Sequence, residues 1–332
     1  MSKRDEMDPK VEETGKKGKK KKEKVKKSVG REILEWVLTI LVAVVAALVI
    51  RSFVFEMVRV DGDSMDDTLA DGEIMFVSKY EYSTTWLCTP FQSNNAKERA
   101  ARITAFGNPD RLDVVICRYP VRGDVNFVKR VVGLPGEKVA LVGGYLQIDG
   151  KPVQEEAEIE GIKAEYRTKY ATDGYSFEEY YVPKKGDTVV IRADSDQEDK
   201  FSLFLNGDEK AWNRKRTCLV LKADGKTLKV YTQNKDESSK EKDGNKLPDS
   251  KVETVISWDG KVMKPAEFIK DYPELLDKEL TVDEDYYFVM GDHRNNSRDS
   301  RSDDVGVLQR SQIIGHAKRV VYPFSNFWHG IE

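Results

Sequence analysis

Three separated segments carry side chains suited to nucleophilic and acid–base chemistry. The first, Val58–Leu69, reads VRVDGDSMDDTL and places Ser64 on the turn that Asp61-Gly62-Asp63 predicts at the end of a strand. A serine hydroxyl becomes a good nucleophile only when a neighbouring base removes its proton. Read alone, a serine in this setting is more simply a turn residue or a helix N-cap.

The second segment contains a candidate base. Asn126–Gly136 reads NFVKRVVGLPG, so Lys129 lies inside an apolar strand pattern. Adjacent strand residues point to opposite faces, and we therefore expect one of Lys129 and Arg130 to point inward. Burial penalises the charged ammonium and lowers the pKa of a lysine from about 10.4 toward the range where it accepts a proton. The alternative is an edge-strand lysine that discourages aggregation.

The third segment, Gly291–Arg301, reads GDHRNNSRDSR and follows the apolar run Tyr286–Met290. Four of its charged residues could pair into a rigid loop, leaving Ser297 to contact a lysine: Asp292, Arg294, Asp299 and Arg301. A solvated polar loop is the simpler alternative. A calcium site built from Asp299, Asp303 and Asp304 is a weaker alternative, because the acidic spacing is not that of an EF-hand loop.

Composition excludes several classes of protein. The chain has 332 residues, of which 39% are hydrophobic, too many for a disordered chain. Its three cysteines, Cys88, Cys117 and Cys218, form neither a disulfide framework nor a zinc pattern. Three histidines leave little material for a histidine-built metal site. We therefore expect neither a metal nor a cofactor.

The N-terminal region predicts a membrane anchor. Residues 1–31 carry a net charge of +7, largely from Lys16–Lys27, and a chain total of −3 leaves −10 for the rest. Ile33–Ile50 and the residues just after it give about 20 apolar positions, enough to span a bilayer. Under the positive-inside rule the basic tail stays in the cytoplasm and everything after Phe55 lies outside. A cleavable signal peptide is disfavoured by the long basic region and the lack of a small-x-small site.

Beyond the anchor the pattern is mainly β. Short β-branched and aromatic runs separated by turn signals predict these strands: Phe53–Val60, Ile74–Ser78, Val114–Cys117, Phe127–Val132, Tyr180–Val182, Thr188–Ile191, Tyr286–Met290 and Ile313–Val321. Ala266–Tyr272 is the clearest later helix, and Thr232–Lys251 is predicted to be a polar loop.

None of the three segments alone identifies the chemistry. Together, in this order after one predicted membrane anchor, they form a specific pattern. The chain resembles the type I signal peptidases, membrane-bound serine/lysine proteases that remove signal peptides, and the Gram-positive bacterial pattern fits best. The resemblance covers the anchor and four further blocks in family order: Val58–Leu69, Leu112–Tyr119, Phe127–Glu137 and Gly291–His316.

The resemblance implies a mechanism. Ser64 would attack the scissile carbonyl, and neutral Lys129 would be the general base. Ser297 matches the family serine that orients the lysine amine. Asp299 with Arg301, and Asp292 with Arg294, match groups that support the loop and position the reacting residues.

The resemblance also implies how substrate is held. The backbone N–H of Ser64 would donate to the oxyanion, with Gly62 at the position where some members add a second donor. The signal peptide would lie extended between the serine and lysine strands, with small residues at −1 and −3. Residues matching the pocket walls, or otherwise ordinary β core, are Val58, Val60, Met65, Leu69, Ile116, Phe127 and Val128.

Four positions depart from the family pattern without removing a reacting group. The family usually has Pro at Asp67, Gly at Leu112, Asn at His293 and an aromatic residue at Cys117. Asp67 matters most, because a carboxylate three residues after the nucleophile could raise the pKa of Lys129. It is the best argument for an alternative, a catalytically impaired relative that binds preproteins or regulates export.

The expected fold is a membrane-anchored signal-peptidase-type β fold with an inserted β-rich second domain. Its parts would be a Lys-rich cytoplasmic tail (1–31), an anchor helix (32–55), a catalytic core (56–140 and 285–322), the insert (141–284) and a C-terminal tail (323–332).

The expected location is the plasma membrane, crossed once, with the catalytic part extracellular. Expected partners are secretory preproteins, membrane lipid and the nearby translocation machinery, and no nucleic acid. A third reading, a membrane-tethered adhesion or scaffold module, treats the ordered blocks as coincidence.

Overall fold

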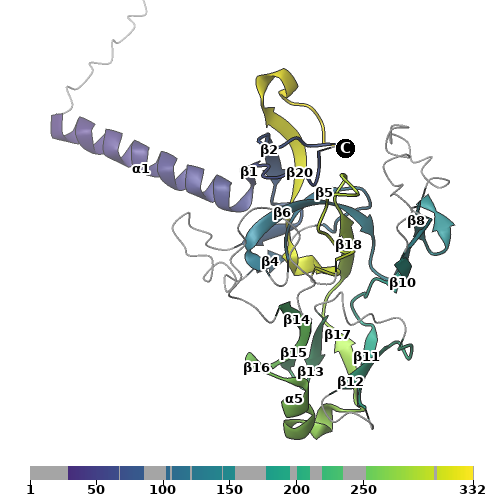
Figure 1. Ribbon diagram of the computed structural model, residues 1–332. Helices are drawn as coiled ribbons and strands as arrows, with labels where there is room; N and C mark the ends of the chain where they lie inside the picture. The colour runs from purple at the N-terminus through teal and green to yellow at the C-terminus, as the bar shows by residue number, and fades with distance from the viewer. Residues whose placement is uncertain are drawn as a thin grey trace, which may run out of the picture. The chain divides into compact units, whose positions relative to one another are not determined.

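The computed structural model describes residues 29–66, 68–85, 102–104, 107–119, 122–143, 145–153, 177–194, 200–209, 219–234, 252–302 and 305–331. The helix α1 (Val29–Phe53; Figure 1) contains Gly30–Arg51, which is long and apolar enough to cross a membrane and is exposed throughout. The chain divides into two compact units, Met1–Ala46 and Ala47–Glu332. The second unit contains every described strand.

One seven-stranded sheet carries the three segments that contain the candidate reactive residues. Its antiparallel strands follow the order β1-β2-β20-β5-β6-β18-β19. Their bounds are β1 Phe55–Arg59, β2 Ile74–Ser78, β20 Ile313–Tyr322, β5 Val114–Tyr119, β6 Arg122–Gly133, β18 Tyr286–Met290 and β19 Leu308–Gln309. The last long strand, β20, therefore lies between β2 and β5 (Figure 1).

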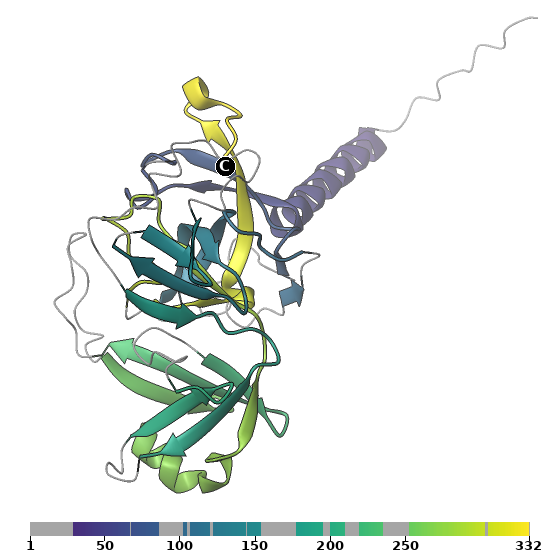
Figure 2. The same cartoon turned by 90° about the vertical axis from the view of Figure 1, so that its right-hand side faces the viewer.

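The chain between β6 and β18 builds two further sheets. A four-stranded sheet has the order β10-β7-β8-β9, and a second seven-stranded sheet has the order β12-β11-β17-β13-β14-β15-β16 (Figure 2). The four strands are β7 Lys138–Val142, β8 Tyr145–Ile148, β9 Lys151–Pro152 and β10 Phe177–Tyr181. The seven are β11 Thr188–Ala193, β12 Phe201–Leu205, β13 Leu219–Ala223, β14 Lys226–Asn234, β15 Val252–Trp258, β16 Lys261–Met263 and β17 Glu279–Val282.

The remaining elements are short. The helix α5 (Pro265–Asp271) begins with proline at its first position, where the missing N–H costs nothing. A small pair is formed by β3 (Ser83–Thr85) and β4 (Arg102–Thr104), and single turns of 3-10 helix are η2 (Pro273–Leu275), η3 (Arg310–Gln312) and η4 (Phe324–Asn326). The predicted mainly β fold with one N-terminal apolar helix is confirmed.

Burial patterns explain why the first sheet can hold charged residues inside. In β12 burial alternates with every second residue, as expected for a sheet with one solvated face, whereas all five residues of β18 are buried. Lys129 and Arg130 are likewise both buried, at 2% and 1% exposure. We expected one of the two to point inward; both are buried, because this part of the sheet is covered on both faces.

The end of the chain folds back on β20. Val320 accepts a hydrogen bond from Trp328 N–H, Gly330 bridges Arg319, and Ile331 is buried. Residues 323–331 thus pack as part of the sheet's edge, where the sequence suggested a tail. The predicted polar loop lies largely outside the described residues.

Candidate active site

Ser64 lies on a tight turn after β1. The entry to the turn is fixed by Val60 N–H donating to Glu73 O, and Gly62 adopts φ +96°, a conformation that favours glycine. Gly62 N–H donates to Asp71 Oδ1 at 3.0 Å, so this proposed oxyanion donor is already engaged. Ser64 N–H donates to no other described residue. The turn therefore leaves the Ser64 amide as its available donor.

Lys129 reaches Ser64 from the middle of β6. Its Nζ lies 2.6 Å from Ser64 Oγ and donates to Val128 O at 2.7 Å. Burial lowers the pKa of Lys129 below its ordinary value, and the positive charge of Arg301 lowers it further. Cys117 and nearby carboxylates oppose the shift without reversing it. A neutral amine at this distance can accept the serine proton.

Asp292 joins the lysine strand to the loop after β18. Arg130 Nε and Nη2 donate to its carboxylate at 2.7–3.1 Å, and Thr68 Oγ1 donates at 2.5 Å. Burial alone would raise the pKa of Asp292, but Arg130 and Arg294 outweigh burial and lower it. Sequence reasoning missed Arg130 and Thr68. For Arg130, the sequence feature that could have indicated this role is its position directly after the candidate base, Lys129.

Asp299 holds the same loop from its other end. Its carboxylate accepts from Arg301 Nε and Nη2, both at 2.8 Å, and from Gly291 N–H at 2.8 Å. These contacts overcome burial and keep the pKa of Asp299 below its usual value. Ser297 Oγ is buried, lies close enough to contribute to that lowering, and makes no hydrogen bond of normal geometry within the described residues. No hydrogen bond joins Ser297 to Lys129 there.

Gly291 brings this loop against the nucleophile. A Cβ built on Gly291 would lie 2.5 Å from Ser64 O and closer still to Ser297 Oγ. His293 N–H also donates to Ser64 O at 3.1 Å. Only glycine allows the approach, so the backbone of Ser64 is held by a segment more than 200 residues away in sequence.

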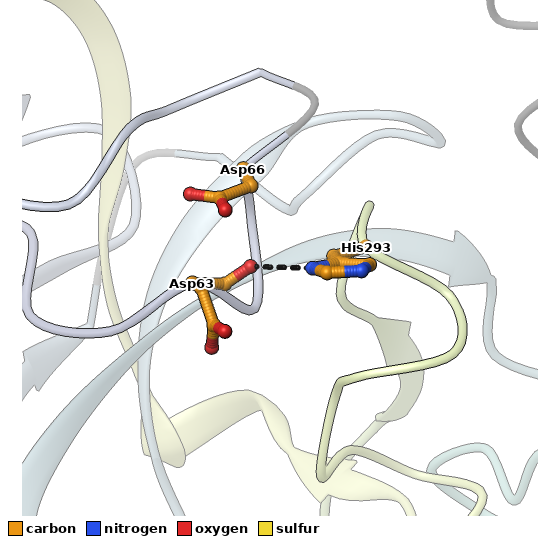
Figure 3. Close-up of side chains that lie close together, drawn as sticks. All are labelled: Asp63, Asp66 and His293. Carbon is orange, nitrogen blue, oxygen red and sulfur yellow. Dashed lines mark hydrogen bonds between the residues drawn. The ribbon is translucent and has the colours of Figure 1, made fainter.

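Three side chains beside the turn resemble a metal site only in that their ligand atoms lie close to one another. Ligand atoms of Asp63, Asp66 and His293 lie within 4.8 Å of one another. Figure 3 shows His293 Nδ1 directed at Asp63 O, 3.1 Å away, and Asn296 Nδ2 donates to Asp63 Oδ2 at 2.6 Å. These hydrogen bonds account for the arrangement, and we assign no metal to it.

The expected pocket residues fall into two groups. Four are fully buried in one hydrophobic cluster: Val60, Met65, Leu69 and Ile116. Val58 and Val128 are partly buried against that cluster, and Phe127 is partly buried against a neighbouring one. Only these three have surface left to touch a peptide directly.

Two strands offer unpaired backbone near Ser64 and Lys129. Among the described strands, β1 pairs only with β2 and so has one open side. Pairing of β18 with β6 runs from Gly133 to Arg130, so Asn126–Lys129 have β5 on one side and no described strand on the other. Both open sides can accept an extended chain.

Of the four departures from the family pattern, Asp67 lies outside the described residues. Leu112 adopts φ +77°, which explains why glycine is usual there and indicates local backbone strain in this chain. Cys117 is buried with a free thiol, whose pKa burial raises to about 12. Cys88 and Cys218 lie outside the described residues.

Comparison with known proteins assigns the class. The family model described as "Signal peptidase, peptidase S26" matches residues 33–185 and 175–322, and the chain belongs to this family. It is 38% identical to Signal peptidase I of Bacillus licheniformis over 142 residues, 40% of this chain and 62% of that protein.

Two other relatives carry related names. Signal peptidase I S of Bacillus subtilis (strain 168) is 37% identical over 125 residues, 38% of this chain and 54% of that protein. Signal peptidase I of Buchnera aphidicola subsp. Schizaphis graminum is 24% identical over 283 residues, 83% of this chain and 70% of that protein. The chain thus spans little more than half the length of the Bacillus relatives.

Proposed function

We propose that this chain is a type I signal peptidase, a membrane-bound serine endopeptidase that cleaves signal peptides from exported preproteins. The observation that carries the proposal is the 2.6 Å separation of Lys129 Nζ and Ser64 Oγ in a buried setting. Neutral Lys129 takes the Ser64 proton as Oγ attacks the scissile carbonyl. The resulting Lys129 ammonium gives this proton to the nitrogen of the leaving peptide. The amine so regenerated accepts a proton from the water that attacks the acyl-enzyme and returns it to Ser64 Oγ as the acyl group leaves.

The oxyanion is held by Ser64 N–H in this mechanism. Gly62 contributes only if its bond to Asp71 opens. The Val128 carbonyl orients the Lys129 amine, while Ser297 would join only after a small shift of its hydroxyl. The ion pairs of Asp292 and Asp299 position the loop that braces Ser64.

The substrate adds an extended strand between the open sides of β1 and β6. Val58, Phe127 and Val128 contact its side chains, with the four buried residues behind them, and small residues at −1 and −3 fit best. The chain anchors through α1 in the plasma membrane with its basic tail cytoplasmic, close to the translocation machinery. The catalytic core of 56–140 and 285–322, and the insert of 141–284, remain our proposed division.

The test is cleavage of a preprotein with an Ala-x-Ala site by the full chain in detergent. Ser64→Ala and Lys129→Ala should each lose activity by on the order of 10⁴–10⁶-fold. Lys261→Ala, at an exposed lysine of β16, serves as the control and should cleave normally. Equal inactivity of wild type and variants on several preproteins would favour the impaired relative, for which the engaged Gly62 amide is the supporting observation.

A further inference from the structure

Leu112 holds a backbone conformation that its side chain makes costly. Its φ is +77°, on the segment just before β5, whereas residues with a Cβ strongly favour negative φ. Such a conformation persists only where the surroundings fix it, and residues of this kind gather at functional sites. The contacts that fix Leu112 therefore indicate what the strain serves.

Two polar contacts hold the Leu112 backbone against β6. Its N–H donates to Val131 O at 2.7 Å, and its carbonyl accepts from Arg130 Nη1 at 2.8 Å. The same guanidinium donates through Nε and Nη2 to Asp292. The Leu112 carbonyl thus engages the third nitrogen of Arg130, the residue directly after the proposed base, Lys129.

The Leu112 side chain makes a separate apolar contact. It packs against the largest hydrophobic cluster of the described residues, and most buried members of that cluster lie in the proposed insert, 141–284. Glycine, which the family usually has at this position, carries no side chain and cannot make this contact. Leu112 therefore joins in one residue a backbone contact to Arg130 and an apolar contact to the cluster of the insert.

Gly133 shows where the insert reaches β6. A Cβ built on Gly133 would lie only 3.3 Å from Val182 Cγ2, and Val182 is a fully buried residue of the insert. Gly133 is two residues beyond Val131, whose carbonyl binds the Leu112 amide. Interiors packed this closely transmit a change in side-chain volume to their neighbours.

We propose that Leu112 is a positioning residue that couples the packing of the insert to the Arg130 guanidinium, and through it to the alignment of Lys129 and Ser64. The coupling rests on the proposed peptidase function and makes turnover depend on the insert. A cavity opened at Val182 lets Leu112 relax to an unstrained φ, and its carbonyl then leaves Arg130.

The test is a double-mutant cycle in the full chain in detergent, with steady-state cleavage of an Ala-x-Ala preprotein. Val182→Ala should lower kcat about five- to tenfold and change KM less than about twofold, because it alters alignment and not substrate binding. In the Leu112→Ala background, which lacks the packed side chain, Val182→Ala should change kcat by less than about twofold. Val230→Ala, at another buried valine of the same cluster on β14, is the matched control and should leave kcat unchanged.

Leu112→Gly separates the strain from the packing. Glycine adopts φ +77° without strain, so its carbonyl stays on Arg130 without help from the insert. Leu112→Gly should therefore recover most of the kcat that Leu112→Ala loses. This comparison tests the coupling even if Val182→Ala fails to fold, which circular dichroism would detect.

Hydrogen exchange of residues 110–118 measures the coupling without cleavage. The Leu112 amide should exchange about tenfold faster in Val182→Ala than in wild type, and at an unchanged rate when Leu112→Gly is added. If wild type cleaves nothing while exchange follows this pattern, the peptidase proposal fails and the coupling of the insert to Arg130 stands. Three results would overturn the coupling: an equal fall of kcat in both backgrounds, unchanged exchange in Val182→Ala, or no recovery by Leu112→Gly.

Discussion

Arg130 and Asp292 form a bidentate ion pair in which both side chains are 1% exposed. The pair links β6, directly beside Lys129, to the loop that touches Ser64. Removing one partner of such a pair leaves a buried charge uncompensated. The pair is therefore a tie between the two halves of the candidate site.

We expect Arg130→Ala to reduce the free energy of unfolding by about 3–5 kcal/mol. The measurement is denaturant unfolding of the full chain in detergent. Arg192→Ala breaks an exposed pair with Asp277 and should cost less than about 1 kcal/mol. Similar losses in the two variants would contradict the structural role of the Arg130 pair.

Peptidase activity should rise from acidic toward alkaline pH. Protonated Lys129 cannot accept the serine proton, and burial lowers its pKa so that the neutral amine appears at lower pH than in a free lysine. The profile of kcat/KM against pH on a soluble peptide tests this. A profile that is flat or falls across that range would exclude Lys129 as the base.

Replacing Lys129 with methionine should stabilise the protein while abolishing cleavage. A lysine whose pKa is lowered in the folded state binds fewer protons there than in the unfolded chain, so wild-type stability rises with pH. The advantage of Lys129→Met should be largest at low and neutral pH and disappear above the unfolded pKa of about 10.4. Thermal unfolding of both proteins at several pH values measures this difference in stability. A difference that does not change with pH would contradict the prediction.

Gly291→Ala should lower kcat by roughly 10²-fold, because the new Cβ displaces the Ser64 carbonyl and with it the nucleophile. Steady-state cleavage is the measurement. Gly150→Asn, at a hairpin turn with φ +76° and no atom within 4 Å, should leave kcat unchanged. Normal turnover by Gly291→Ala would show that the loop does not set the position of Ser64.

Local patterns predicted the strands that line the candidate site better than those of the insert. Ile74–Ser78 and Tyr286–Met290 match β2 and β18 residue for residue, because both are continuous apolar runs bounded by turns. β13 and β14 were missed, since Lys222 and Lys229 interrupt their apolar pattern on solvated faces. Such strands are fixed by pairing with neighbours rather than by their own composition.

The site itself was predictable only as a set of residue types. The sequence identified Ser64, Lys129 and the 291–301 loop as candidates. Which of these groups meet depends on strand pairing between segments more than 200 residues apart. The Arg130–Asp292 pair and the close approach at Gly291 come from that long-range register. Strand alternation alone could not reveal that both faces of β6 are covered.

The place of β20 in the first sheet has a consequence for biogenesis. Ser64 and Lys129 are translated early, yet the strand that lies between β2 and β5 begins at Ile313, near the end of the chain. Nonlocal pairing of this kind forms only once β20 has been made. A partly synthesised chain without β20 would carry Ser64 and Lys129 but lack the strand that joins the two parts of the sheet holding them, so we expect it to show no peptidase activity.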